Sequence, residues 1–159
     1  MEFSVYTVSS RGFLNRTNFD IYKDNILAFA ASKNSFWKSF NWSMDNVKTN
    51  DYYELRSSNF WASHFIITKN NKEIAAIERE TFKSSYAVNS IYGKHFVDVK
   101  SFGKIFSLSD SEQEIAKVSR RSMKSKDRLG IAIKNIIDEG YVILLFLLLD
   151  RMLELESST

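Results

Sequence analysis

The sequence of 159 residues contains no cysteine and no proline, and only 5 glycines. Without cysteine the chain has no disulfide, no thiolate metal ligand and no cysteine nucleophile. Because proline and glycine are the usual turn formers, turns must instead depend on Asn, Asp, Ser and Lys. The same scarcity argues against a flexible linker, so we expect a single domain over residues 1–159.

Familiar catalytic and targeting signals are also missing. The sequence has no G-x-S-x-G, no glycine-rich phosphate loop and no H-E-x-x-H. Its two histidines, His64 and His95, do not have the spacing of metal ligands. The first residues lack the basic stretch and apolar segment of a secretory signal. We therefore predict a cytoplasmic protein that is not an enzyme and needs no cofactor or metal.

Charge and composition define the broad class. The apolar fraction is 44% and the aromatic fraction 14%, which predicts a globular protein with a bulky core. The net charge of +3 is compatible with anionic partners but does not single one out. We expect a monomer, and such a mild positive charge does not favour nucleic acid as its partner.

Two segments resemble each other without a gap at an offset of 41 residues. They are "FIITKNNKEIAAIERE", beginning at Phe65, and "FSLSDSEQEIAKVSRR", beginning at Phe106. Each reads as a β-hairpin, with two alternating strands joined by a four-residue polar turn at 69–72 or 110–113. A third segment, "FDIYKDNILAFA" at 19–30, has the same plan around Lys-Asp-Asn.

Further strands are expected at 85–90, 94–100 and 130–135, which makes roughly nine to twelve in all, enough for a sandwich or a barrel. Residues 31–55 fit neither the helical nor the strand period, and we predict strand and loop there. The segment is rich in rings, including Phe36, Trp37, Phe40 and Trp42.

Eight consecutive large apolar residues, Val142 to Leu149, lie near the C-terminal end of the sequence. Leucine-rich composition and the polar continuation "DRMLELE" favour a helix over a strand. A helix without a polar face must be buried in protein or lipid. The eight residues rise only about 12 Å, against the roughly 30 Å of a bilayer core, so we predict burial in protein and no transmembrane segment.

The repeated hairpins of the form F-x-I/L, polar turn, E-I-A-x-I/V, followed by "EGYVILLFLLLDRM", resemble the tubby C-terminal-like superfamily. That superfamily includes the LURP-one-related and phospholipid scramblase families, and residues 55–156 carry the resemblance. It implies a mainly β (α+β) fold: a closed antiparallel barrel of about 12 strands around a hydrophobic helix at about 141–156. Scramblase activity is not expected, because the sequence shows neither an acidic calcium loop nor a spanning helix.

The segment 117–134 is the candidate functional site. It contains seven cations and the single acid Asp127. Such a cluster can bind lipid phosphates through charge-assisted hydrogen bonds. The alternative is a solvated face that only aids solubility. Tubby proteins bind phosphoinositides through basic residues of the barrel surface, but those positions do not align here residue by residue. The candidate headgroup-binding residues are Lys117, Arg120, Arg121, Lys124, Lys126 and Arg128, with Lys134 at the end of the segment.

The functional hypothesis is a binding module that contacts anionic phospholipid or phosphoinositide headgroups at the membrane periphery. The alternative is a protein–protein interaction scaffold without a lipid role, using aromatic side chains among residues 36–42. Both hypotheses follow from composition and not from a catalytic motif.

Overall fold

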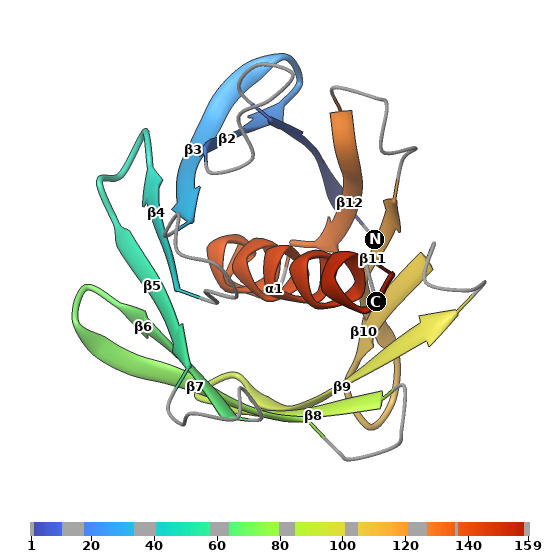
Figure 1. Cartoon of the computed structure of the whole chain (residues 1–159). Helices are drawn as coiled ribbons and strands as arrows, with labels where there is room; N and C mark the ends of the chain where they lie inside the picture. The colour runs from blue at the N-terminus through green and yellow to red at the C-terminus, as the bar shows by residue number, and fades with distance from the viewer. Residues whose placement is uncertain are drawn as a thin grey trace.

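The structure of the protein is a computed structural model. It describes residues 2–10, 18–33, 41–57, 64–79, 85–100, 105–120, 127–135 and 137–157. Within these ranges the chain forms twelve strands followed by one helix (Figure 1). The strands are β1 (Phe3–Ser10), β2 (Asn18–Lys23), β3 (Ile26–Lys33), β4 (Trp42–Asn46), β5 (Tyr52–Ser57), β6 (His64–Lys69), β7 (Lys72–Arg79), β8 (Ser85–Ser90), β9 (Gly93–Lys100), β10 (Ile105–Ser109), β11 (Glu114–Arg120) and β12 (Asp127–Lys134), and the helix is α1 (Glu139–Ser157).

The twelve strands form one closed antiparallel barrel. Each strand pairs with its neighbours in sequence, and the pairing of β1 with β12 closes the ring. That closing pair runs from Phe3 opposite Lys134 to Ser9 opposite Asp127. The predicted barrel is confirmed, and closure leaves no strand of the ring without a partner on either side.

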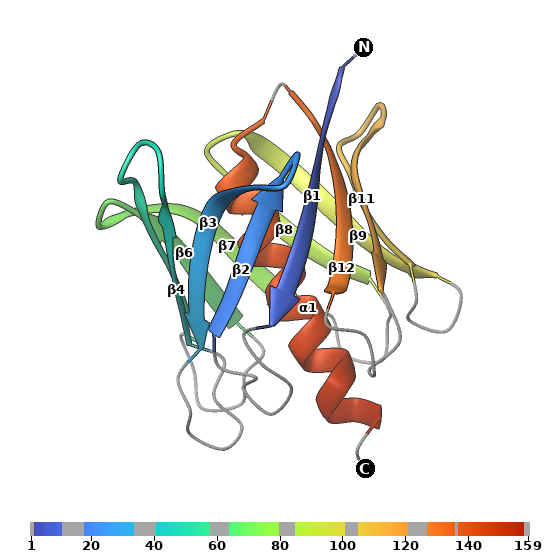
Figure 2. The ribbon, with the colours of Figure 1, turned by 90° about the horizontal axis from the view of Figure 1, so that it is seen from above.

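The helix α1 passes through the inside of the barrel (Figures 1 and 2). Every residue from Tyr141 to Leu149 is buried, with none more than 2% exposed. The apolar run is therefore a protein-enclosed helix, and its bounds of 139–157 lie close to the predicted 141–156. Burial of the eight residues from Val142 to Leu149 contributes roughly 12 to 24 kcal/mol at most. Within the described ranges, no helix has the length and apolarity needed to cross a bilayer.

The strands surround the helix with their inward-facing side chains. Alternation along each strand directs every second residue inward, so the core contains residues such as Val8, Ile21, Leu55 and Ile131, all 0% exposed. The aromatic contacts follow the same geometry, for example Phe106 with Phe146 of the helix at a centroid distance of 6.3 Å. The bulky core that the aromatic fraction predicted is therefore a shell of strand residues around α1.

Asparagine and aspartate occupy most of the described turn positions with positive φ, as the composition predicted, and Gly93 occupies one. Positive φ angles occur at Asp24, Asn25, Asn50, Asn70 and Asn71. These residue types tolerate the left-handed region better than other residues that carry a side chain. The turn between β6 and β7 contains two residues and not the predicted four, because Lys69 and Lys72 still pair as the ends of their strands.

A β-bulge explains the repeated "E-I-A". In the β6–β7 hairpin the register shifts so that Ile74 is the extra residue, and in the β10–β11 hairpin Ile115 occupies the same place. A bulge allows two consecutive residues to face the same side. Ile74 and Ala75 are both buried, as are Ile115 and Ala116. The β2–β3 hairpin has an equivalent shift at Ala28.

The segment that matched no period contains two regular strands, β4 and β5. They are joined across 47–51, where the Asn46 side chain accepts hydrogen bonds from the backbone N–H groups of Lys48 and Thr49 at 3.0 and 3.1 Å. Trp42 is buried and packs on Phe19 at a centroid distance of 5.3 Å. Phe36, Trp37 and Phe40 lie outside the described residues.

Gly140 provides a test of how closely the barrel fits the helix. A Cβ at this position would lie 2.7 Å from Cε2 and Oη of Tyr53, a ring that is itself hydrogen-bonded. We expect Gly140→Ala to lower the free energy of unfolding by about 1 to 3 kcal/mol in urea denaturation. Gly130→Ala is the control, because a Cβ at Gly130 meets no atom within 4 Å. Equal stability of the two variants would contradict this close fit.

Candidate functional site

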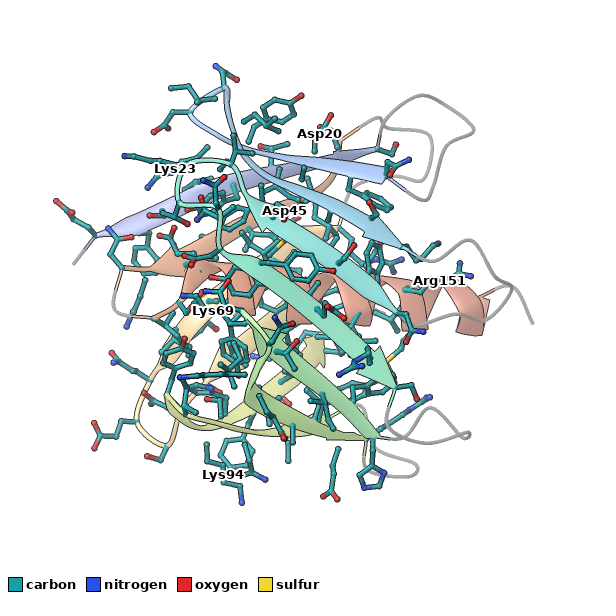
Figure 3. The ribbon with its side chains drawn as sticks, turned by 90° about the vertical axis from the view of Figure 1, so that its left-hand side faces the viewer. Asp20, Lys23, Asp45, Lys69, Lys94 and Arg151 are labelled. Carbon is teal, nitrogen blue, oxygen red and sulfur yellow. The ribbon has the colours of Figure 1, made fainter. Side chains whose placement is uncertain are left out.

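The barrel has two ends, which are named here by the elements that lie at each of them. At one end, here called the turn end, lie the tight turns at 24–25, 70–71 and 91–92, and there α1 begins (Figure 2). At the opposite end, here called the connection end, β1, β3, β5, β7, β9 and β11 finish, and the last turns of α1 extend past the strands (Figure 2). In Figure 3, Lys23 and Lys69 lie toward the turn end and Arg151 toward the connection end.

Asp138 is the centre of a hydrogen-bonded cluster at the turn end. Its carboxylate accepts hydrogen bonds from the Tyr53 and Tyr92 hydroxyls and from Lys69 Nζ, each at 2.8 Å. It also accepts a bond from the backbone N–H of Tyr141 at 3.2 Å, which makes Asp138 the N-cap of α1. The cluster therefore ties the first turn of the helix to β5, to β6 and to the turn that precedes β9.

Protonation equilibria in this cluster follow from its geometry. Burial alone would raise the pKa of Asp138, but the hydrogen bonds from Lys69, Tyr92 and Tyr53 outweigh it, so the pKa lies below its usual value. Burial and the neighbouring carboxylate raise the pKa of Tyr53 and of Tyr92. At neutral pH the cluster therefore contains an ionised Asp138 and neutral tyrosines.

Two further contacts complete this end of the core. The Tyr6 hydroxyl donates a hydrogen bond to Glu139, and burial followed by that bond raises the pKa of Tyr6. Nδ1 of the buried His95 lies 3.0 Å from the Tyr141 hydroxyl, and burial lowers the pKa of His95. Tyr6, Tyr53, Tyr92 and Lys69 are therefore each hydrogen-bonded to a carboxylate at the start of α1.

The second helix anchor lies at the connection end. Nε of Arg120, the last residue of β11, donates a hydrogen bond to the Asp150 carboxylate of α1 at 2.8 Å. The side chains are only 20% and 9% exposed, and the guanidinium also lies over the Phe106 ring at 5.9 Å. Arg120 therefore points inward and holds the helix.

Of the predicted headgroup-binding residues, the structure describes only the side chains of Lys117 and Arg120, and these two do not share one surface. Lys117 is exposed on the outer face of β11, whereas Arg120 faces inward. Lys134 is buried, and its Nζ donates to Gln113 at 2.7 Å, so it lies at the turn end. Arg121, Lys124 and Lys126 lie outside the described residues, and Arg128 is described only as part of the β12 backbone.

The residues that join the strand ends differ in charge between the two ends. The six sequence segments that link strands at the connection end are 11–17, 34–40, 58–63, 80–84, 101–104 and 121–126. Together they contain eight cations and eight aromatic residues against one acid, Glu80. Among the described residues that link the elements at the turn end, the acids are Asp24, Asp51, Asp110, Glu112 and Asp138 and the one cation is Lys48. The cations Lys23, Lys69, Lys72, Lys94 and Lys134 lie at or next to the adjoining strand ends. Sequence reasoning missed this asymmetry because it examined one segment at a time.

No constellation for metal catalysis is present in the part of the chain that the structure describes. Among those residues, no three His, Asp or Glu side chains gather in a way that would hold a metal ion. His64 is an exposed partner of Glu78, with Nε2 and Oε1 2.8 Å apart.

Comparisons with known proteins identify a shared fold. No family model matches the sequence, and no curated protein matches it either. The X-ray structure of the Arabidopsis thaliana protein AT5G01750 is similar, with a TM-score of 0.66 over 94% of this chain and 91% of that one. The sequence identity is 14%. The similarity therefore shows that the two proteins share a barrel with an internal C-terminal helix, and it shows nothing beyond the fold.

Asp138 makes a pH-dependent contribution to stability. Its folded pKa is depressed, so the contribution is present above the unfolded pKa of about 3.9 and is lost as pH falls through the folded value. Asp138→Asn should lower the free energy of unfolding by about 2 kcal/mol at pH 7, because three hydrogen bonds lose their charged acceptor. Urea denaturation from acid to neutral pH measures both effects. A variant as stable as the wild type at pH 7 would rule out this anchor.

Arg120 should matter for stability more than its neighbour Lys117. Arg120→Gln removes the hydrogen-bonded ion pair to the nearly buried Asp150 carboxylate, and we expect a loss of about 2 to 3 kcal/mol. Lys117→Gln removes an equal charge from an exposed side chain and should change stability by less than about 0.5 kcal/mol. If Asp150→Asn restores stability in the Arg120→Gln background, the pair interacts directly, and additive losses would argue against the pair.

Proposed function

We propose that this protein is a non-enzymatic binding module that docks peripherally on anionic phospholipid or phosphoinositide surfaces with the connection end of its barrel. In this proposal the protein belongs to the tubby C-terminal-like superfamily, close to the LURP-one-related proteins, and acts in the cytoplasm. The support for the proposal comes from the sequence of the strand connections: those at the connection end contain eight cations and one acid, whereas those at the turn end are mainly acidic.

The physical argument concerns orientation. A juxtamembrane cation contributes about 1 kcal/mol to attraction by an anionic leaflet, and the attraction decays within a Debye length. Eight cations concentrated at one end would attract the leaflet, and the acids of the turn end would be repelled by it. The barrel would therefore meet the membrane end-on. The same segments contain Trp37 and Trp61, and tryptophan favours the membrane–water interface.

The helix supports the same end-on orientation. At the connection end the last turns of α1 extend beyond the strands (Figure 2). The cations proposed to make that contact are Arg121, Lys124 and Lys126. Arg120 is not among the proposed contact residues, because it forms an ion pair with Asp150 of α1.

Vesicle co-sedimentation of the purified protein tests the proposal. The protein should bind vesicles that contain phosphatidylserine or a phosphoinositide and not vesicles of phosphatidylcholine alone. Raising the salt concentration from about 0.1 to 0.5 M should release it, because headgroup contacts through phosphates are screened. Arg121→Glu, Lys124→Glu and Lys126→Glu together should abolish binding with little change in melting temperature.

The matched control reverses three exposed cations toward the turn end, Lys48, Lys72 and Lys94, each to glutamate. Both triple variants have the same net charge, so only the location differs. Retained binding in the control and lost binding in the first variant would support end-on docking, whereas equal binding of the two would refute it. If no vesicle binds under any condition, the alternative of a protein interaction scaffold becomes the stronger hypothesis.

A further inference from the structure

Exposed apolar side chains gather at the turn end of the barrel. Within the described ranges, five large ones lie in or beside the turns there: Ile26, Leu27, Val47, Ile91 and Tyr92. The other three lie on the outer faces of β1 and β9. Ile26 and Ile91 are 71% and 69% exposed, the largest values of the set. Exposed apolar residues that gather among polar ones are typical of a binding surface.

Hydrogen bonds hold the turns that carry these side chains near the start of α1. The Val47 N–H donates to the Ala28 carbonyl at 3.0 Å, which joins the β4–β5 connection to β3. The Tyr92 hydroxyl donates to Asp138 at 2.8 Å, which holds the β8–β9 turn against the residue that precedes the helix. The apolar turns therefore belong to one surface around the beginning of α1.

The tip of the β8–β9 hairpin is unusual for its residue types. Ile91 and Tyr92 occupy a position where polar residues or glycine are usual, whereas the tips at 24–25 and 70–71 are Asp-Asn and Asn-Asn. The Ser90 hydroxyl stabilises this turn by accepting a hydrogen bond from the Tyr92 N–H at 3.1 Å. The turn therefore does not depend on the Ile91 side chain. A local sequence rule that is broken without a gain in stability indicates a functional role.

An open hollow of about 470 Å³, here called the acidic hollow, lies beside Tyr92 at the start of α1. Its lining includes three acids, Asp51, Asp138 and Glu139, and one cation, Lys69. The Lys69 ammonium lies 2.8 Å from a carboxylate oxygen of Asp138 and 3.9 Å from one of Asp51. The carboxylates of Asp51 and Asp138 therefore converge on one ammonium position. Because acids outnumber cations in the lining, the hollow attracts a further positive charge.

Two details of the acidic hollow also favour a cation. The Lys69 ammonium lies 5.4 Å from the centroid of the Tyr53 ring, and aromatic faces attract cations. Asp51 accepts hydrogen bonds from the Asn70 and Thr49 side chains at 3.0 and 2.8 Å. These bonds hold the pKa of Asp51 below its usual value. Asp51 is therefore ionised at neutral pH and fixed in position.

The residue next to Tyr92 lines a second hollow. This one measures about 310 Å³, and its lining includes Ala75 and Ala76 of β7 together with Ile91. Since Ile91 and Tyr92 are consecutive, a hollow that favours a cation and a hollow with apolar walls lie beside the same hairpin tip. A ligand that fits both has a positive charge close to an apolar group.

We propose that the turn end binds a segment of a partner protein in which a lysine or arginine stands next to apolar residues. The cation enters the acidic hollow between Asp51 and Glu139, and the apolar side chains cover Ile91 and the hollow beside it. The proposal goes beyond membrane docking and does not depend on it. A barrel docked by its connection end would direct its turn end away from the membrane, so both surfaces can be occupied together.

Selection of displayed random linear peptides on the purified full-length chain tests the proposal. The enriched peptides should carry lysine or arginine next to leucine, isoleucine, valine or an aromatic residue. Ile91→Ser should weaken binding of the best selected peptide about tenfold, because apolar contact area is lost. Asp51→Asn should weaken it about fivefold, because a charged acceptor is lost. Raising the salt concentration from about 0.1 to 0.5 M should weaken wild-type binding as well.

Matched controls make the same chemical changes elsewhere on the surface. Val5→Ser alters an exposed apolar residue on the outer face of β1, and Asp98→Asn alters an exposed acid of β9. Both should bind the selected peptide as the wild type does. Equal losses in Val5→Ser and Ile91→Ser would overturn the inference. So would a selection that enriches no sequence, or only sequences without a cation.

Two further measurements separate this surface from other interactions. Sedimentation velocity should show a monomer, and an oligomer that Ile91→Ser dissolves would mean that a second copy of the chain is the occupant, against the proposal. The triple variant of Arg121, Lys124 and Lys126 should keep its peptide affinity, and Ile91→Ser should keep its vesicle binding. Loss of peptide binding in the triple variant would overturn the assignment to the turn end, whereas loss of vesicle binding alone concerns only the connection end.

Discussion

A helix with no polar face must be removed from water on all sides, and the rest of this structure depends on that constraint. An open sheet covers one face of a helix, whereas a closed barrel covers its whole circumference. Polar contacts to the helix are therefore concentrated at its two ends. Asp138 meets Lys69 at the first turn, and Asp150 meets Arg120 where the helix leaves the barrel. These two ion pairs fix the depth of the helix along the barrel axis.

The similar hairpins β2–β3, β6–β7 and β10–β11 help the sheet to close around the helix. After the turns near 25, 70 and 112, each returning strand carries a bulge, at Ala28, Ile74 and Ile115. A bulge increases the local twist of a strand pair, and twist helps a sheet to close. In the two copies first seen in the sequence, it also directs two consecutive side chains toward the core. The repeated "E-I-A" therefore marks a β-bulge in each of these two hairpins, in addition to an alternating strand.

The sequence predicted the strands, the turns and the buried helix because these depend on local information, whereas the closure of the strands into a barrel was implied only by the resemblance to the tubby C-terminal-like superfamily. Hydrophobic alternation, Asn-rich turns and an unbroken apolar run can be read within a few residues of each position. Asp138 also carried a local signal, since an aspartate immediately before a helix is a typical N-cap. Its partners carried none, because Tyr53, Lys69 and Tyr92 lie 85, 69 and 46 residues away.

The segment 117–134 shows what could not be predicted from the sequence alone. Counting cations from 117 to 134 treats them as one surface, but alternation places Lys117 outside and Arg120 inside. Because β12 then runs back along the barrel, Lys134 lies at the opposite end. Charge at each barrel end can be assigned only when the direction of every strand is known.

The order of elements along the chain has a consequence for biosynthesis. A ribosome makes the twelve strands before it makes α1, and β1 finds its partner β12 only after more than a hundred further residues have been added. Until then the inward-facing side chains have no helix to pack on, and β1 has an unpaired edge. Folding of the barrel is therefore completed only after α1 has been made, and until then the unpaired edge of β1 and the apolar inner faces of the strands favour aggregation.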